Sequence, residues 1–411
     1  MAAALRRAAP ALVVLVAIVA MALLWSWGGD IYLRLRAAAG LKPYSPFLDL
    51  HAVMSAIECW DRGVDVYAEN PCDIFGRLHI YSPLWLRLPT AFGDPILLRP
   101  LGLMLAFAFA ASLLWLPAAP RGRAELAVLL ATASPVVAFA LERANADLLI
   151  FLLVVSGALL MARSQAARIA GYALFLLGAM LKFYPLVLLA VVLRERPRVV
   201  FALVLVAAAI LHTSFGAFGD ETRRAIANIH IQALFWGSFA AHNLPRGLFL
   251  ATGSMAVAAL ALAAGIGVGA LAVRRVAGVQ GLATMDPVTR SLLLVCGTLV
   301  VGCFLAGENI EYRAIFLLPT LPALLTLPAT RHAGWLAAAL MWEPLARRIA
   351  VHLSPAAGDV PSGADLLLWA VHNLAWWWMA GVLLALVLTL LHNAPGLALL
   401  RPWATGRPGR R

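Results

Sequence analysis

The sequence predicts an all-α polytopic membrane protein with about twelve transmembrane helices. Of its 411 residues, 63% are hydrophobic and 13% are charged, and the mean hydropathy is +0.88. The apolar residues also occur in runs long enough to span a bilayer, with short connectors that carry clustered arginines. The net charge of +12 is therefore a topology signal, and we expect membrane lipids rather than nucleic acid as partners.

The expected spans follow one another along a single transmembrane domain, residues 1–392. Arginine-rich connectors alternate with arginine-poor ones, which predicts that both termini are cytoplasmic. The first run is interpreted as a signal anchor, because its apolar stretch of about 17 residues exceeds the hydrophobic region of a cleaved signal peptide. The expected spans lie near 10–27, 96–117, 125–141, 147–162, 169–181, 184–193, 198–214, 248–272, 290–306, 312–328, 334–350 and 366–391.

The segments outside the spans define the remaining organisation. Two extracytoplasmic loops are expected, at about 28–95 and 215–247, and a basic tail at 393–411 is expected in the cytoplasm. Arginine replaces nearly every lysine and alanine is abundant, a composition that suggests a GC-rich bacterial genome. The predicted location is therefore a bacterial inner (cell) membrane.

One of the chain's two lysines, Lys182, lies between two apolar runs that are too short to cross the hydrocarbon untilted. The connector 182–185 must then dip below the outer surface, where Lys182 could meet a lipid phosphate. A charge within a membrane is a hypothesis of function by default. The alternative is a lysine that snorkels from a helix end into water.

The first outward loop contains apolar residues at helical spacing, which predict an amphipathic helix over 50–61 on the outer leaflet, closed by Gly63. Asp49 stands immediately before it. Asp49 is interpreted either as an N-cap or as a general base, and the two roles are compatible because a capped carboxylate keeps a lone pair. The spaced residues are Leu50, Val53, Met54, Ile57 and Trp60.

Four more residues of this loop are candidates. Tyr81 and Trp85 suit re-entry into the membrane interface, or they could stack on a sugar ring or contact an acceptor. Cys59 and Cys72 face an oxidising compartment and could close a disulfide that contributes roughly 3 kcal/mol.

Three other outward connectors concentrate polar groups on the same face. Segment 142–147 contains Arg143 and Asn145, segment 235–246 contains Asn243, and segment 308–313 contains Arg313. Each alone could be a solvated helix end. Together they provide cations for a phosphate and carboxylates for a base. No Asp-X-Asp motif or His/Cys cluster occurs, so we expect no metal and no cofactor. The alternative is a metal held by loop acids such as Asp30 or Asp61.

Four features of the loops form a recognisable set: an acidic residue opening the first loop, Gly63-Val64-Asp65-Val66-Tyr67, Tyr81-Ser82-Pro83-Leu84 and Leu181-Lys182-Phe183-Tyr184-Pro185. With these motifs the chain resembles the GT-C superfamily of membrane glycosyltransferases, most closely glycosyltransferase family 87. The resemblance covers roughly residues 45–325. Two segments depart from it: 142–147 replaces an expected Gly-Asn-Gln type of sequence, and 242–244 matches an Asn-X-Ser stretch loosely.

The resemblance implies transfer of a sugar, with mannose expected, from a polyprenyl phosphate to a hydroxyl of a glycolipid or glycan, with inversion. Asp49 matches the family's catalytic aspartate. Lys182 and Tyr184 match the motif at the donor phosphate, and the four connector residues are expected to bind the donor as well.

The reaction chemistry is consistent with these residues even without the family resemblance. A phosphate leaving group already carries negative charge, so it needs cations to stabilise it rather than an acid to protonate it. Two other classes remain open. A transporter or lipid flippase also needs about twelve helices, although no clear internal repeat occurs. A membrane acyltransferase would need a catalytic histidine such as His372, for which helix packing is the alternative.

Overall fold

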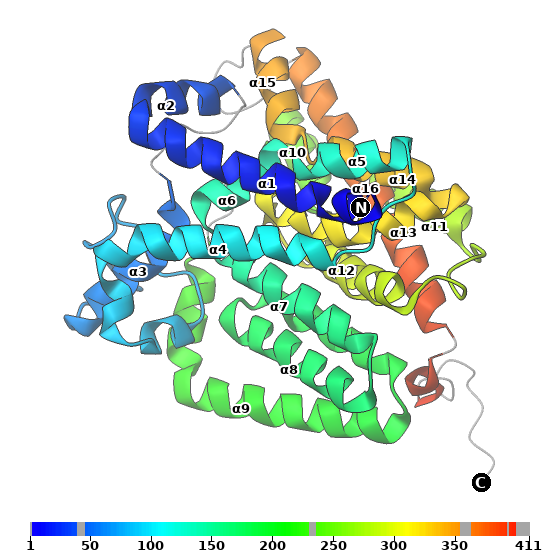
Figure 1. Cartoon of the computed structure of the whole chain (residues 1–411), viewed down its shortest axis with the longest axis horizontal. Helices are drawn as coiled ribbons and strands as arrows, with labels where there is room; N and C mark the ends of the chain where they lie inside the picture. The colour runs from blue at the N-terminus through cyan, green and yellow to red at the C-terminus, as the bar shows by residue number, and fades with distance from the viewer. Residues whose placement is uncertain (1, 39–45, 230–235, 354–362, 393, 400–411) are drawn as a thin grey trace.

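A computed structural model describes residues 2–38, 46–229, 236–353, 363–392 and 394–399. These residues fold almost entirely into helices, sixteen of them α-helices, as Figure 1 shows. The exception is one pair of two-residue strands, β1 (Ser238–Phe239) and β2 (Asn309–Ile310), which is antiparallel. The all-α prediction is confirmed.

Within the described residues, seven helical segments are long and apolar enough to cross a membrane. Three further apolar helices are shorter, at 146–161, 165–181 and 184–194. This is the pattern of a multi-pass membrane protein. The seven segments are Leu5–Ser26, Pro95–Trp115, Arg123–Arg143, Pro197–Ala227, Met255–Val276, Pro287–Ala306 and Asp365–Leu391.

The N-terminal half contains the first loop that the sequence predicts to be extracytoplasmic and the two short apolar helices that flank Lys182. In Figure 1, α1, α4, α7, α8 and α9 run in similar directions across the molecule. The elements are α1 (Ala2–Trp27), α2 (Gly29–Ala38), α3 (Leu48–Asp61), η1 (Pro83–Arg87), η2 (Thr90–Gly93), η3 (Pro95–Leu97), α4 (Leu98–Ser112), η4 (Leu113–Trp115), α5 (Arg123–Thr132), α6 (Pro135–Arg143), α7 (Ala146–Met161), α8 (Gln165–Leu181), η5 (Tyr184–Arg194) and α9 (Pro197–Ala227).

The C-terminal half contains α12, which is the most deeply buried candidate span, with 78% of its window inside the protein. It packs against α7, η5, η6 and α16. The elements are α10 (Asn243–Thr252), α11 (Met255–Val276), α12 (Pro287–Ala306), η6 (Glu311–Thr320), α13 (Leu321–Thr326), η7 (Pro328–Thr330), α14 (Arg331–Leu340), α15 (Glu343–Leu353), α16 (Gly363–Leu391) and η8 (Pro395–Leu399).

Several expected spans are interrupted. Segment 125–141 divides into α5 and α6, because Ser134 caps the amide of Val137 and Pro135 opens a new helix. Segment 248–272 divides at Gly253, which has a φ of 67°. Segments 312–328 and 334–350 are likewise each divided between two helices.

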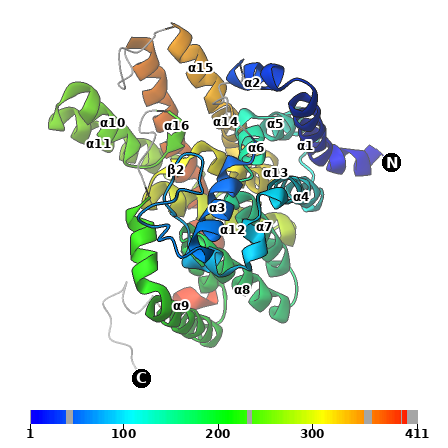
Figure 2. The ribbon, with the colours of Figure 1, turned by 90° about the vertical axis from the view of Figure 1, so that its left-hand side faces the viewer.

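Two expected loops also differ from the structure. Helix α9 continues through Ala227 with a kink at Phe218, so the segment from 215 begins as helix rather than as loop. The predicted helix after Asp49 is present as α3, but nine of its fourteen residues are buried. It packs against η1 and η2 and lies near the centre of the face shown in Figure 2, so much of its surface contacts protein. In the expected tail, residues 400–411 lie outside the described residues.

Candidate functional site

Asp49 lies in the first turn of α3, where the chain enters from an unusual backbone conformation. Helix α3 begins at Leu48, and its N-cap is Phe47, which has a φ of 63° and makes no side-chain cap. The amide of Phe47 donates to the carbonyl of Glu142 at 2.6 Å. The N-cap interpretation of Asp49 is therefore wrong, because its carboxylate binds side chains of another segment instead of the helix amides.

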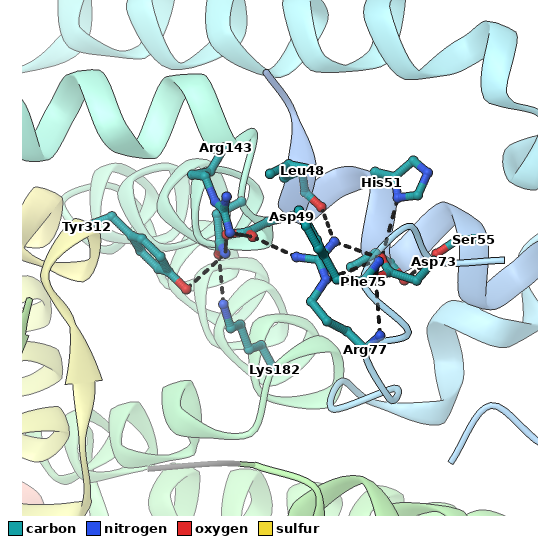
Figure 3. Close-up of polar contacts among 12 residues, drawn as sticks. Leu48, Asp49, His51, Ser55, Asp73, Phe75, Arg77, Arg143, Lys182 and Tyr312 are labelled. Carbon is teal, nitrogen blue, oxygen red and sulfur yellow. Dashed lines mark hydrogen bonds and ion pairs between the residues drawn. The ribbon is translucent and has the colours of Figure 1, made fainter. Parts of the chain in front are cut away.

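Two side chains, one at the last residue of α6 and one two residues beyond it, hold the Asp49 carboxylate, as Figure 3 shows for Arg143. Arg143 Nη2 lies 2.7 Å from Asp49 Oδ1. Asn145 Nδ2 donates to Asp49 Oδ2 at 2.6 Å. Ala144, between them, has a φ of 43°, and with Phe47 it makes up the non-glycine residues of positive φ in the described chain. Such conformations cost about 1–3 kcal/mol and persist where the surroundings enforce them.

Asn145 is the junction of the site, and it is fully buried. Its Oδ1 caps α7 by accepting from the amide of Asp147, and it also accepts from Lys182 Nζ, both at 2.9 Å. Its Nδ2 donates to Tyr312 Oη at 3.0 Å as well as to Asp49. One amide side chain thus connects the carboxylate on α3 to the lysine at the end of α8.

A second carboxylate, Asp147, contacts three of the predicted donor-binding residues, Lys182, Tyr184 and Arg313. It is fully buried and lies 2.9 Å from Lys182 Nζ, and Tyr184 Oη donates to it at 2.7 Å. Arg313 Nε is 3.4 Å from its other oxygen. The ammonium group of Lys182 lies 5.2 Å from the centre of the Tyr81 ring, and its side chain is 12% exposed. Lys182 therefore does not snorkel into water.

A turn of the first loop brings in an arginine that sequence reasoning missed. Arg77 donates to Asp73 through Nε and Nη2, at 3.0 and 2.7 Å, and to the carbonyl of Leu48 at 2.8 Å. Its Nη1 lies 3.5 Å from Asp49 Oδ1. Burial alone would raise the pKa of Asp73, but hydrogen bonds from His51 and Arg77 lower that pKa below its ordinary range.

A disulfide fixes this turn relative to α3. Cys59, in the last turns of α3, is bonded to Cys72, and their Cα atoms are 5.9 Å apart. Cys72 immediately precedes Asp73 in the chain. The same bond therefore joins the helix that carries Asp49 to the turn that carries Arg77.

The predicted sugar contacts both lie against the lysine connector. Trp85 Nε1 donates to the carbonyl of Leu181 at 3.0 Å, at the last residue of α8. Tyr81 is buried beneath Lys182, and burial together with the charges of Asp49 and Asp147 raises the pKa of its phenol. Both aromatic residues therefore hold Lys182 in place.

Asn243 is not among the side chains that bond to one another around Asn145. Its Nδ2 donates to Ser238 Oγ at 3.0 Å, next to the β1–β2 pair. That pair contacts the site through Asn309 of β2, whose Oδ1 accepts a hydrogen bond from Arg313 Nη1. His372 accepts a hydrogen bond from Trp376 Nε1 at 3.1 Å, one turn along the same helix.

Charged groups of both signs contact one another at the site. Four cations, Arg77, Arg143, Lys182 and Arg313, contact three carboxylates, Asp49, Asp73 and Asp147. The N-terminal turns of α3 and α7 also lie here, and helix N-termini favour anions. The arrangement suits an anionic ligand with a carboxylate beside it.

Asp147 could have been predicted from the sequence, because Asn145-Ala146-Asp147 is a typical helix start and an apolar run follows it. Among the residues that the structure describes, no group of three or more His, Cys, Asp or Glu side chains is close enough to hold a metal ion. Comparison of the chain with protein-family models, curated proteins and solved structures found no match.

Proposed function

We propose that this protein is an inverting glycosyltransferase of the extracytoplasmic membrane surface. It moves a sugar, with mannose expected, from a polyprenyl phosphate to a hydroxyl group of a glycolipid or glycan. The observation that carries the proposal is the joining of Asp49 to Lys182 through Asn145, which places a base and a phosphate-binding cation in one network.

Asp49 is the proposed general base. Its Oδ1 contacts Arg143 and Arg77, whereas its Oδ2 accepts from Asn145. Each carboxylate oxygen can accept about two hydrogen bonds, so Oδ2 retains the capacity to accept from an acceptor hydroxyl. The side chain is 10% exposed, and it is held from three directions, which fixes its orientation toward the acceptor.

Lys182 and Arg313 are the proposed cations for the leaving phosphate. Their side chains are 12% and 14% exposed, so their charges are weakly screened by water. As the bond between the anomeric carbon and the phosphate oxygen breaks, charge builds on that oxygen, and fixed cations stabilise it. Asp147 serves as their counter-ion and positions them, and it does not take part in proton transfer.

The proposed orientation places the Asp49 site outside and both termini in the cytoplasm of a bacterial inner membrane. Helix α7 begins at the site with Asn145 and ends beside Arg163, as the positive-inside rule requires. The three shorter apolar helices, η6 with α13, and α14 complete about twelve passes.

The test is sugar transfer by purified protein in lipid vesicles, from radiolabelled polyprenyl-phosphate sugars, mannose first, to extracted membrane lipids. Asp49→Asn should lower transfer by about 10²–10⁴-fold, the usual contribution of a general base. The matched control is Asp61→Asn, which removes an exposed carboxylate at the other end of the same helix and should leave transfer unchanged.

Two results would count against the proposal. Transfer by Asp49→Asn at the wild-type rate would remove that residue from the chemistry. Absence of transfer from every donor, in folded protein supplied with extracts rich in acceptors, would favour the transporter or lipid flippase, which a flipping assay on the same vesicles then tests.

A further inference from the structure

A second charged recess lies at the opposite end of the Arg123–Arg143 span from Arg143. It is a small, open crevice of about 30 Å³ between the start of α1, the end of η4 and the start of α5. None of its lining residues belongs to the Asp49 site.

The crevice combines two guanidinium groups with apolar walls. Arg6 and Arg7 line it, and neither is paired with a carboxylate within the described part of the chain. Glu125 is the one acidic residue of the lining, so the lining carries a net positive charge. The apolar walls include Leu113, Leu116, Val128 and Leu129.

We propose that this crevice binds an anionic glycerophospholipid. The phosphodiester lies between Arg6 and Arg7, because guanidinium groups bind phosphate through paired hydrogen bonds. An acyl chain lies along the leucine and valine wall. Arg6 and Arg7 precede the apolar run of α1 by a few residues, which puts them at the depth of lipid headgroups. In the orientation proposed above, the lipid comes from the cytoplasmic leaflet.

The experiment measures lipid binding to the full-length protein in detergent by native mass spectrometry, with phosphatidylglycerol and with phosphatidylcholine of the same acyl chains. We expect wild type to prefer phosphatidylglycerol. Arg6→Gln/Arg7→Gln should bind it about thirtyfold more weakly, at about 1 kcal/mol for each arginine. The matched control, Arg121→Gln/Arg123→Gln, removes two exposed arginines that do not line the crevice and should bind like wild type.

A filling variant separates the crevice from general charge attraction. Leu116→Trp keeps both arginines and occupies the apolar space, and it should weaken phosphatidylglycerol binding severalfold in protein whose thermal midpoint without added lipid is unchanged. Unchanged binding by Arg6→Gln/Arg7→Gln, or by Leu116→Trp, would overturn the proposal. Displacement of the lipid by millimolar inorganic phosphate would also overturn it, by assigning the site to free phosphate. These readouts are independent of sugar transfer.

Discussion

Replacing Asp49 and replacing Asp147 by asparagine should have different effects, the first on sugar transfer and the second on stability. Asp147 is fully buried and is the counter-ion of Lys182 and Arg313. Asp147→Asn removes that charge and, in either amide orientation, points an NH₂ group at a donor. Asp49→Asn leaves Arg77 its bidentate partner Asp73, and it removes the carboxylate that contacts Arg143.

The burial of the stranded cations sets the size of the difference. Removing one partner of a buried ion pair costs roughly 3–5 kcal/mol, because an uncompensated charge stays inside the protein. We expect this cost for Asp147→Asn. A hydrogen bond to a charged group is worth about 1.5–3 kcal/mol, and we expect Asp49→Asn to lie at the low end because the Asp49 side chain is 10% exposed, whereas that of Asp147 is fully buried. Asp147→Asn should therefore be less stable than Asp49→Asn by roughly 2 kcal/mol.

The assay is unfolding of purified protein in detergent, followed by thermal midpoint and by denaturant titration, with transfer measured on the same preparations. Asp49→Asn should stay close to wild type in stability and lose transfer, whereas Asp147→Asn should unfold at clearly lower temperature. The double variant Asp147→Asn/Arg313→Gln should recover part of the loss, because it removes one stranded cation. Equal stability of the two single variants, or no recovery in the double variant, would refute the counter-ion role of Asp147.

Three further predictions concern stability. Replacing both cysteines of the Cys59–Cys72 disulfide by alanine should cost roughly 3 kcal/mol in unfolding titrations, and reductant should lower the wild type to the same level. Burial lowers the pKa of His79 to about 4, so between pH 4 and 6.5 the unfolded chain binds more protons than the folded protein. The free energy of unfolding should therefore fall by roughly 3 kcal/mol as the pH drops through that window. His79→Gln should flatten the dependence of the thermal midpoint on pH. Gly381→Ala should cost about 1–3 kcal/mol, because its Cβ would clash with the carbonyl oxygen of Gly269 between α11 and α16. Gly267→Ala, at a glycine that faces open space, should leave the thermal midpoint unchanged.

The sequence was a good guide where hydrophobicity and charge act locally. Apolar run length predicted the helical membrane architecture, and the two short runs predicted the break at Lys182, which ends α8 in an extended conformation. It was a poor guide to helix interruptions such as Ser134–Pro135, since the hydropathy of the run is continuous across the break while the capping and proline geometry are not.

The site itself was predicted in part. Lys182, Asn145 and Arg313 carry polar groups beside apolar runs, so their positions were visible as exceptions to the pattern. Arg77 was not visible, because it lies in a polar loop where an arginine is unexceptional. Its role depends on the turn closed by Asp73 and on a contact with α3 that is 28 residues away in sequence, and no local pattern encodes that contact.

The strained residues explain how Asp49 and Asn145 come to lie 2.6 Å apart. Phe47 and Ala144 both adopt left-handed backbone conformations, each one or two residues before a side chain of the site. The Phe47 amide bonds to the carbonyl of Glu142, so the two strained segments hold each other. This brings the N-terminal turns of α3 and α7 together, so the positive ends of the two helix dipoles lie at the same position. Asp49, Asn145 and Asp147 occupy that position, and under the proposed function the two helix ends and Lys182 together stabilise the donor phosphate.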